Sequence, residues 1–332
     1  MRSRTVRGPG DGSGGADPSR VRLRLAEAMG LLPVGLRWRQ GLIALRGQPD
    51  VPPSRFGVSS LALLRPRIAL RLWRGRSWIH RQVLLTNLFN HRQTPTELGW
   101  SVRRTQMEDF RGRDMTYDSH NGTDLSIPVG TTVLTAAAGQ VVHVVSEFHR
   151  GGLKVFIDHG AGLMTCYAHL ARALVQPGQR VDRGEPIAIS GYSGLDGFIT
   201  FPFGVPHVHF NTWLNGEPVD PFARPGEQSL WRGGAPTPPD GQGTDGFAPS
   251  RYDLQAAQAA LEACKTDTLQ DVLRAIDAPA ERAARTVIEM NYYPTRFPVR
   301  PNLYGEQHPR APRLDLPFRA AEFDGAVFVD ER

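Results

Sequence analysis

The chain has 332 residues, a formal net charge of +6, 40% hydrophobic residues and 22% charged residues. This composition is typical of a globular protein with room for one large or two ordinary domains. The most apolar stretches are short and are interrupted by Arg65, Arg67 and Arg71, which excludes a transmembrane span there.

The positive charge is concentrated in the first third of the chain. Residues 1–114 hold 21 arginines and 8 acidic residues, so the remaining residues are net acidic. A basic segment favours anionic partners such as a wall polymer or a membrane surface, and we expect no nucleic acid partner. An arginine bias of the encoding genome is the alternative explanation. The oligomeric state is not readable from the sequence.

Residues 1–19 are rich in Gly, Ser and charge, which predicts a disordered tail without the apolar core of a secretory signal. Residues 20–112 form an Arg-rich accessory region, with one or two short amphipathic helices expected before residue 47. Residues 58–92 predict either a membrane-surface helix or a helical or mixed subdomain packed on its neighbour. His80 and His91 have no evident partners and are expected at the surface.

Residues 113–224 change to a β pattern. Gly and Pro punctuate this region at short intervals and separate short runs of β-forming residues, which fall at 125–127, 140–145, 153–157, 162–169 and 186–189. Many short strands with this turn spacing predict a mainly β domain.

Two different segments follow. Residues 225–252 are rich in Gly and Pro and leave little to bury, which predicts a linker. Residues 253–332 predict a helical extension, because apolar residues recur at three- and four-residue spacing, and the proline-rich tail from Pro294 is expected to be extended. Met290 is expected in the core of these helices.

Five polar residues of the β region have the chemistry of a metal site. In a strand, His207 and His209 point to one face while Val208 and Phe210 point to a core. His120 on a loop, Asp124 at the entry to a strand and one of the two histidines at 207 and 209 would supply three ligands of a catalytic Zn²⁺. His169 and the remaining histidine would then handle protons. The alternation in its strand predicts that Tyr167 points the same way as His169.

These segments carry a family resemblance. The order His120-x-x-x-Asp124, then Tyr-Ala-His-Leu ending at Leu170, then His-Val-His-Phe ending at Phe210, resembles the lysostaphin-type zinc endopeptidases, or LytM-domain peptidases. The likeness covers about a third of the chain, from Asp114 to Arg224. It implies a lysostaphin-like fold of antiparallel β-sheets, hydrolysis of peptide bonds in bacterial cell-wall peptidoglycan, and a place in the cell envelope or outside the cell.

The resemblance also assigns roles. It implies that one Zn²⁺ per chain is held by His120, Asp124 and His209, with His169 and His207 as the unligated catalytic pair. Tyr117 is a further candidate for a hydrogen bond. His159 matches a position interpreted as structural, and the remaining histidines are expected at the surface: His143, His149 and His308. Cys166 and Cys264 do not have a metal-type spacing, and whether they pair is left open.

One segment departs from the family pattern. Twelve residues, 195–206, separate Gly194 from His207, where relatives have only a few, and three of them are phenylalanines. This loop is expected either to shape the substrate cleft or to form an aromatic plug on the N-terminal region. The alternative function is a catalytically silent LytM-like module that binds the wall or activates a partner.

Overall fold

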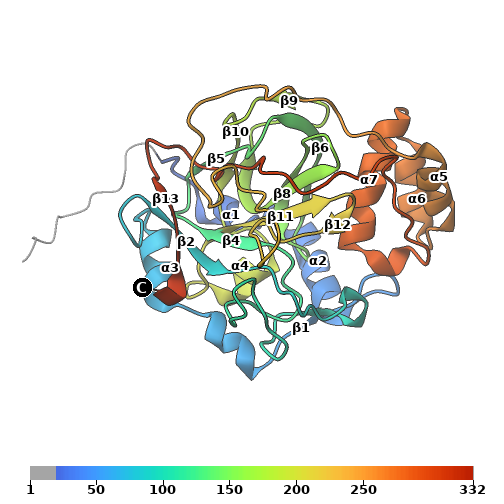
Figure 1. Cartoon of the computed structure of the whole chain (residues 1–332). Helices are drawn as coiled ribbons and strands as arrows, with labels where there is room; N and C mark the ends of the chain where they lie inside the picture. Colours follow the sequence, from blue (N-terminus) through green and yellow to red (C-terminus); the bar gives the residue numbers. More distant parts are fainter. Residues whose placement is uncertain (1–19, 332) are drawn as a thin grey trace, which may run out of the picture.

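The computed structural model describes residues 20–331 and contains one large sheet, with helices before and after it in the chain (Figure 1). The predicted tail at residues 1–19 lies outside the described residues. The mainly β fold with helical N- and C-terminal parts is confirmed. The helices are α1 (Leu25–Ala28), α2 (Val34–Arg46), α3 (Pro66–Trp73), α4 (Leu195–Thr200), α5 (Leu254–Ala263), α6 (Asp267–Arg274) and α7 (Pro279–Tyr292), with 3₁₀ turns η1 (Val58–Leu63), η2 (Thr96–Leu98), η3 (Pro294–Arg296) and η4 (Val329–Glu331).

The large sheet has the strand order β13-β2-β4-β11-β8-β7-β6-β9, with β10 bridging β5 and β8 and with β12 beside β11. All neighbours are antiparallel except β13 and β2. A separate parallel pair is formed by β1 (Ser54–Arg55) and β3 (Trp100–Ser101). The strands of the large sheet are β2 (Gln82–Asn87), β4 (Thr123–Ser126), β5 (Thr132–Leu134), β6 (Gly139–Glu147), β7 (Gly152–Asp158), β8 (Leu163–Ala173), β9 (Arg180–Val181), β10 (Pro186–Ser190), β11 (His207–Leu214), β12 (Glu217–Pro218) and β13 (Gly325–Phe328).

The N-terminal region contributes a strand to this sheet. β2 lies between β4 and β13, and its Leu85 is fully buried opposite Leu125 of β4. The apolar face of α3 packs into the same core through Ile68 and Leu72. This arrangement matches the predicted subdomain packed on its neighbour, because the apolar face of α3 is already covered. The sheet therefore continues across the expected boundary at residue 113.

The Gly- and Pro-rich segment 225–252 buries more than we expected. Trp231 is fully buried, and its ring stacks on Phe210 of β11 with centroids 5.8 Å apart. The segment has almost no regular secondary structure, yet one large aromatic side chain is enough to anchor extended backbone in the core. The chain after Pro294 is likewise extended but packed, and it ends by adding β13 to the sheet.

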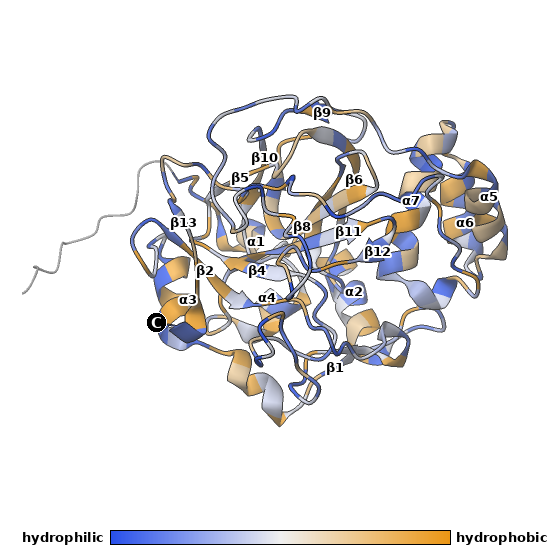
Figure 2. Cartoon of the chain, viewed as in Figure 1, coloured by the Kyte–Doolittle hydropathy of each residue, from blue (hydrophilic) through white to orange (hydrophobic). Residues whose placement is uncertain are grey.

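The C-terminal helices α5, α6 and α7 build a second core of their own, which includes Met290 as predicted. Each of these helices carries hydrophobic and hydrophilic residues in alternation (Figure 2). A smaller cluster joins α7 to the sheet, where Ile288 contacts the group that contains Trp213. Cys166 and Cys264 are both free and buried, in different clusters. Among residues 20–331, no helix has the length and apolar character that crossing a membrane requires.

Candidate metal and catalytic site

Two neighbouring strands position the candidate ligands. Asp124 of β4 and His209 of β11 are directly paired across the sheet, and His120 lies on the loop that precedes β4. Val208 and Phe210 are fully buried in the main core, so His207 and His209 share the opposite face, as the alternation predicts.

The three ligand atoms converge. Oδ1 of Asp124 lies 3.1 Å from Nε2 of His120 and 2.8 Å from Nδ1 of His209, and these two nitrogens are 3.2 Å apart. One ligand atom from each residue lies within 4.8 Å of the others, and all three residues are buried. Nδ1 of His120 donates to the carbonyl of Leu88 at 2.6 Å, which fixes the ring so that its Nε2 is the atom that faces Asp124. A carboxylate oxygen and two imidazole nitrogens thus converge on one point, where a bound cation could be contacted by all three.

Asp124 is held from outside the β4–β11 pair. Its Oδ2 accepts a hydrogen bond of 2.7 Å from Nδ2 of Asn87, at the end of β2. Burial alone would raise the pKa of Asp124, but the adjacent imidazoles of His207 and His120 outweigh it and hold the pKa well below its ordinary value. Asp124 therefore stays ionised, as a metal ligand requires.

His169 and His207 form a second pair of imidazoles beside the ligands. Their rings are 4.9 Å apart, and Nε2 of His207 lies 3.4 Å from Oδ1 of Asp124. Nδ1 of His207 donates to the carbonyl of Val205 and Nδ1 of His169 to that of Ser193, at 2.7 and 2.8 Å. Both Nε2 atoms are therefore free to accept a proton. Burial, reinforced by the neighbouring histidines, lowers the pKa of His169 to about 3, so this imidazole is neutral near pH 7.

The predicted common face of Tyr167 and His169 is wrong. Tyr167 packs against Phe210 in the core, whereas His169 faces the site. The reason is a bulge in β8: His169 has a φ of 59°, and the register with β7 shifts between Leu153 and Val155. The extra residue breaks the two-residue alternation and turns His169 toward His207.

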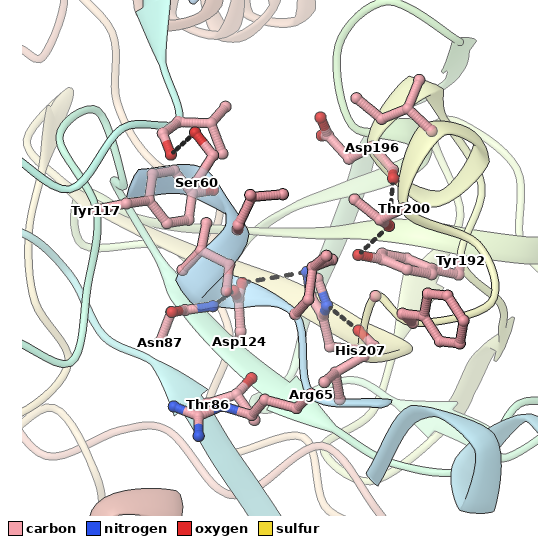
Figure 3. A pocket seen from close by; sticks show the side chains of 18 of the residues that line it. Ser60, Arg65, Thr86, Asn87, Tyr117, Asp124, Tyr192, Asp196, Thr200 and His207 are labelled. Carbon is pink, nitrogen blue, oxygen red and sulfur yellow. Dashed lines mark hydrogen bonds and ion pairs between the residues drawn. The ribbon is translucent and has the colours of Figure 1, made fainter. Parts of the chain in front are cut away.

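A pocket of about 350 Å³ adjoins this site, between η1 and the 195–206 loop (Figure 3). Asp124 and His207 lie on one wall, and Phe201 and Phe203 of the loop line another. The loop contains α4 and also packs on the N-terminal region, since the ring of Phe201 meets Trp73 edge-on at 5.2 Å. Both expected roles of the loop thus have contacts that support them.

Several smaller expectations were wrong or are now refined. His91 is not a free surface residue, because its Nε2 lies 3.0 Å from Oδ2 of buried Asp220. His143 and His149 are covered by the α7 region, where they contact Arg285 and Tyr293, respectively. His80 is exposed as expected.

Two more candidates have defined surroundings. His159 is fully buried between Ala138 and Thr165, in keeping with a structural role. The ring of Tyr117 packs on His120 with centroids 4.4 Å apart and lines the pocket.

Two amides that orient the candidate ligands were not predicted from the sequence. Asn87 holds Asp124, and Nδ2 of Asn211 lies 3.0 Å from Nε2 of His209 while donating to the carbonyl of Asn121. Asn211 falls two residues after His209, so the same alternation that paired the histidines could have placed it on their face. No sequence pattern pointed to Asn87, because its contact with Asp124 depends on which strand pairs with β4.

Comparison with known proteins identifies part of the chain. Residues 118–221 match the family model described as Peptidase family M23. The chain is 41% identical over 101 residues to the peptidoglycan DD-endopeptidase ShyA of Vibrio cholerae, covering 30% of this chain and 22% of ShyA. It is 34% identical over 103 residues to the lipoprotein NlpD/LppB homolog of Pseudomonas aeruginosa, covering 31% and 32% of the two chains.

Among solved structures, a zinc containing peptidase from Vibrio cholerae is 28% identical, with a TM-score of 0.31, over 42% of this chain and 38% of that one. The chain thus spans about a fifth to two fifths of the length of the relatives it matches. The matched segment contains all five predicted site residues, together with the β4, β8 and β11 strands that position them. Residues 118–221 of this chain are a peptidase family M23 domain of the LytM type.

Proposed function

We propose that this chain is a zinc-dependent endopeptidase that hydrolyses peptide bonds of bacterial peptidoglycan. The observation that carries the proposal is the convergence of His120, Asp124 and His209 on one point, with the imidazoles of His169 and His207 alongside. Two imidazole nitrogens and one carboxylate are a common ligand set of catalytic zinc, which keeps a fourth position open.

In this proposal His120, Asp124 and His209 hold one Zn²⁺ per chain. When bound, zinc lowers the pKa of a water molecule and polarises the carbonyl of the scissile bond. The hydrogen bonds from Asn87 to Asp124 and from His120 to Leu88 fix the two ligands before the metal arrives, which favours affinity because less side-chain freedom is lost on binding.

His169 and His207 are assigned to proton transfer. In both rings Nδ1 donates to a backbone carbonyl, which leaves Nε2 as the atom for proton transfer. A neutral imidazole can take a proton at Nε2 and return it to the leaving amine later in the reaction. Either can also steady negative charge that develops on the carbonyl oxygen, once it is protonated.

The substrate class and the cellular place come from relatives. Peptidoglycan cleavage is in the name of ShyA, and a second relative is named a lipoprotein. We extend the substrate class to this chain and place it in the cell envelope. The Arg-rich N-terminal region is proposed as a contact to an anionic wall polymer or membrane surface.

The test is a digest of purified cross-linked peptidoglycan, with products identified by mass spectrometry. The protein is assayed as prepared, after chelation and after zinc is restored, with zinc content measured in parallel. We expect cleavage that disappears with the chelator and returns with zinc. Asp124→Ala should lower zinc content to near zero and cleavage by at least about a thousandfold, whereas exposed His80→Ala should change neither.

A folded, zinc-loaded protein that cleaves no peptide would overturn the proposal. That result would favour the silent module that binds the wall or activates a partner. A folded protein that binds no zinc at micromolar metal would overturn the assignment of the ligands as well.

A further inference from the structure

Arg150 is a buried cation at the edge of the site. It lies in the turn between β6 and β7, and only 6% of its surface is exposed. The guanidinium carbon lies 4.7 Å from the centre of the Trp100 ring and 5.7 Å from that of Tyr293. Two aromatic rings from segments far apart in the chain thus fix the guanidinium in place through cation–π contacts.

This guanidinium forms no close ion pair within the described part of the chain, although the carboxylates of Glu147 and Asp196 act on it from further away and oppose the lowering of its pKa by burial. No carboxylate of residues 20–331 comes within 4.0 Å of it, none of its nitrogens donates a hydrogen bond there, and Nε is buried without a partner. Glu147, at the end of β6, is paired with Lys154 at 2.6 Å instead. Burying an unpaired charge is costly, so a group outside this set is expected to pair with it.

Arg150 lines a recess beside the candidate metal ligands. The recess is lined by Arg150, Asn121, His169, Asp196 and His209, among others, and has a volume of about 30 Å³. That is room for about two water-sized atoms. This room suits the two oxygens of one carboxylate. Because His169 and His209 form part of its wall, a group bound there would adjoin the scissile bond.

We propose that Arg150 binds a free carboxylate of the peptide substrate, on the residue next to the bond that is cut. The proposal rests on the function proposed above and adds a residue that determines specificity. The planar guanidinium can donate two parallel hydrogen bonds to a carboxylate, which a lysine cannot. Asp196 of α4 lines the same recess without forming a close ion pair with Arg150. Its negative charge repels a bound carboxylate and therefore lowers the affinity for the substrate.

The test compares two soluble cross-linked peptides of identical sequence, one with free carboxylates and one with those carboxylates amidated. Zinc-loaded wild type is expected to favour the free acid by about 10- to 100-fold in kcat/KM, mostly through KM. Arg150→Met should reduce this preference to less than about threefold, because the charged donor is gone. Arg150→Lys should give an intermediate preference, and Asp196→Asn should raise it.

Arg274→Met is the matched control, because Arg274 lies on α6 within the C-terminal helices and should leave the preference unchanged. Wild type that cuts both peptides equally would overturn the role of Arg150 and leave the proposed function standing. A preference that survives in Arg150→Met would also overturn it. Wild type that holds zinc and cuts neither peptide would instead overturn the proposed function. If Arg150→Met fails to fold, the wild-type preference between the two peptides and the effect of Asp196→Asn still test the proposal.

Discussion

The regions before and after the peptidase domain both pack against it, but they reach the candidate metal ligands in different ways. Residues of the N-terminal region touch two ligands directly: Asn87 donates to Asp124, and the carbonyl of Leu88 accepts from His120. The C-terminal helices reach a ligand only through an intermediate residue. The hydroxyl of Tyr292 donates to Asn211, and Asn211 in turn contacts His209. The matched family segment therefore does not contain all the groups that orient its ligands.

This difference follows from how each region packs. β2 is a strand of the same sheet as β4, so its side chains share a surface with Asp124. The helices α5, α6 and α7 bury most of their apolar residues against one another, and only α7 meets the sheet. We infer that damage to the N-terminal strand should reach the metal site, while damage to the C-terminal helices should mostly stay local.

Core truncation should show the largest contrast. Leu85→Ala in β2 and Leu273→Ala in α6 each remove a fully buried side chain and should each cost about 2–5 kcal/mol of folding free energy. Leu85→Ala should also lower zinc affinity, because Asn87 lies two residues further along the same strand, whereas Leu273→Ala should not. Denaturant unfolding and zinc titration of both variants measure this. Equal losses of zinc affinity would show that the two regions are not different in this respect.

Removing a single amide tests the same difference between the two regions without leaving a cavity in the core. Asn87→Ala deletes the hydrogen bond that orients Asp124 and should weaken zinc binding by about 10- to 100-fold. The matched control is Asn291→Ala on α7, whose amide donates to Gly216 and Val287. It should change zinc affinity by less than about threefold. Competition with a chromophoric chelator provides both constants, and an unchanged affinity in Asn87→Ala would remove the N-terminal region from the site.

Lowering the pH should destabilise the protein through two histidines at the interface between α7 and the sheet. Burial, together with Arg285, lowers the pKa of His143 to about 3, and burial lowers that of His149 to about 4. An unfolded histidine titrates near 6.5, so between about pH 6.5 and 4 the unfolded chain binds more protons and stability falls as the pH falls. The loss should be up to about 2 kcal/mol per histidine at pH 5.

Urea unfolding at pH 7.5 and pH 5.0 measures this loss of stability. His143→Gln should make the stability less dependent on pH, since one titrating group is gone, while exposed His80→Gln should not. A variant without His143 that is as acid-sensitive as wild type would contradict the assignment.

The smallest effect is expected at the C-terminal contact to the site. Tyr292→Phe removes the hydroxyl that donates to Asn211 and lies 3.3 Å from the sulfur of Cys166. Stability should fall by about 1 kcal/mol and peptide cleavage by no more than a few fold. Kinetics on the same cross-linked peptides measure the second figure. A loss as large as that of Asn87→Ala would mean that both flanking regions govern the ligands.

Local sequence patterns predicted the family of the central domain and much of the local structure. The family was predicted from the order of the five site residues and the sequences that flank them: His120, Asp124, His169, His207 and His209. The alternation in 207–210 predicted that Val208 and Phe210 point into the core. The periodicity after residue 252 likewise predicted three helices. These features depend on neighbours in the chain, whose spacing fixes which side chains share a face.

Tertiary structure alone decided which distant groups complete the site. Asn87 became a partner of Asp124 because β2 pairs with β4 in one particular register, and no local pattern encodes that pairing. The bulge at His169 reversed the face that simple alternation predicts. Trp231 and Arg150 make their aromatic contacts with segments more than ten residues away in the chain. Such contacts are chosen by the packing of the whole core, so they appear only when the chain is folded.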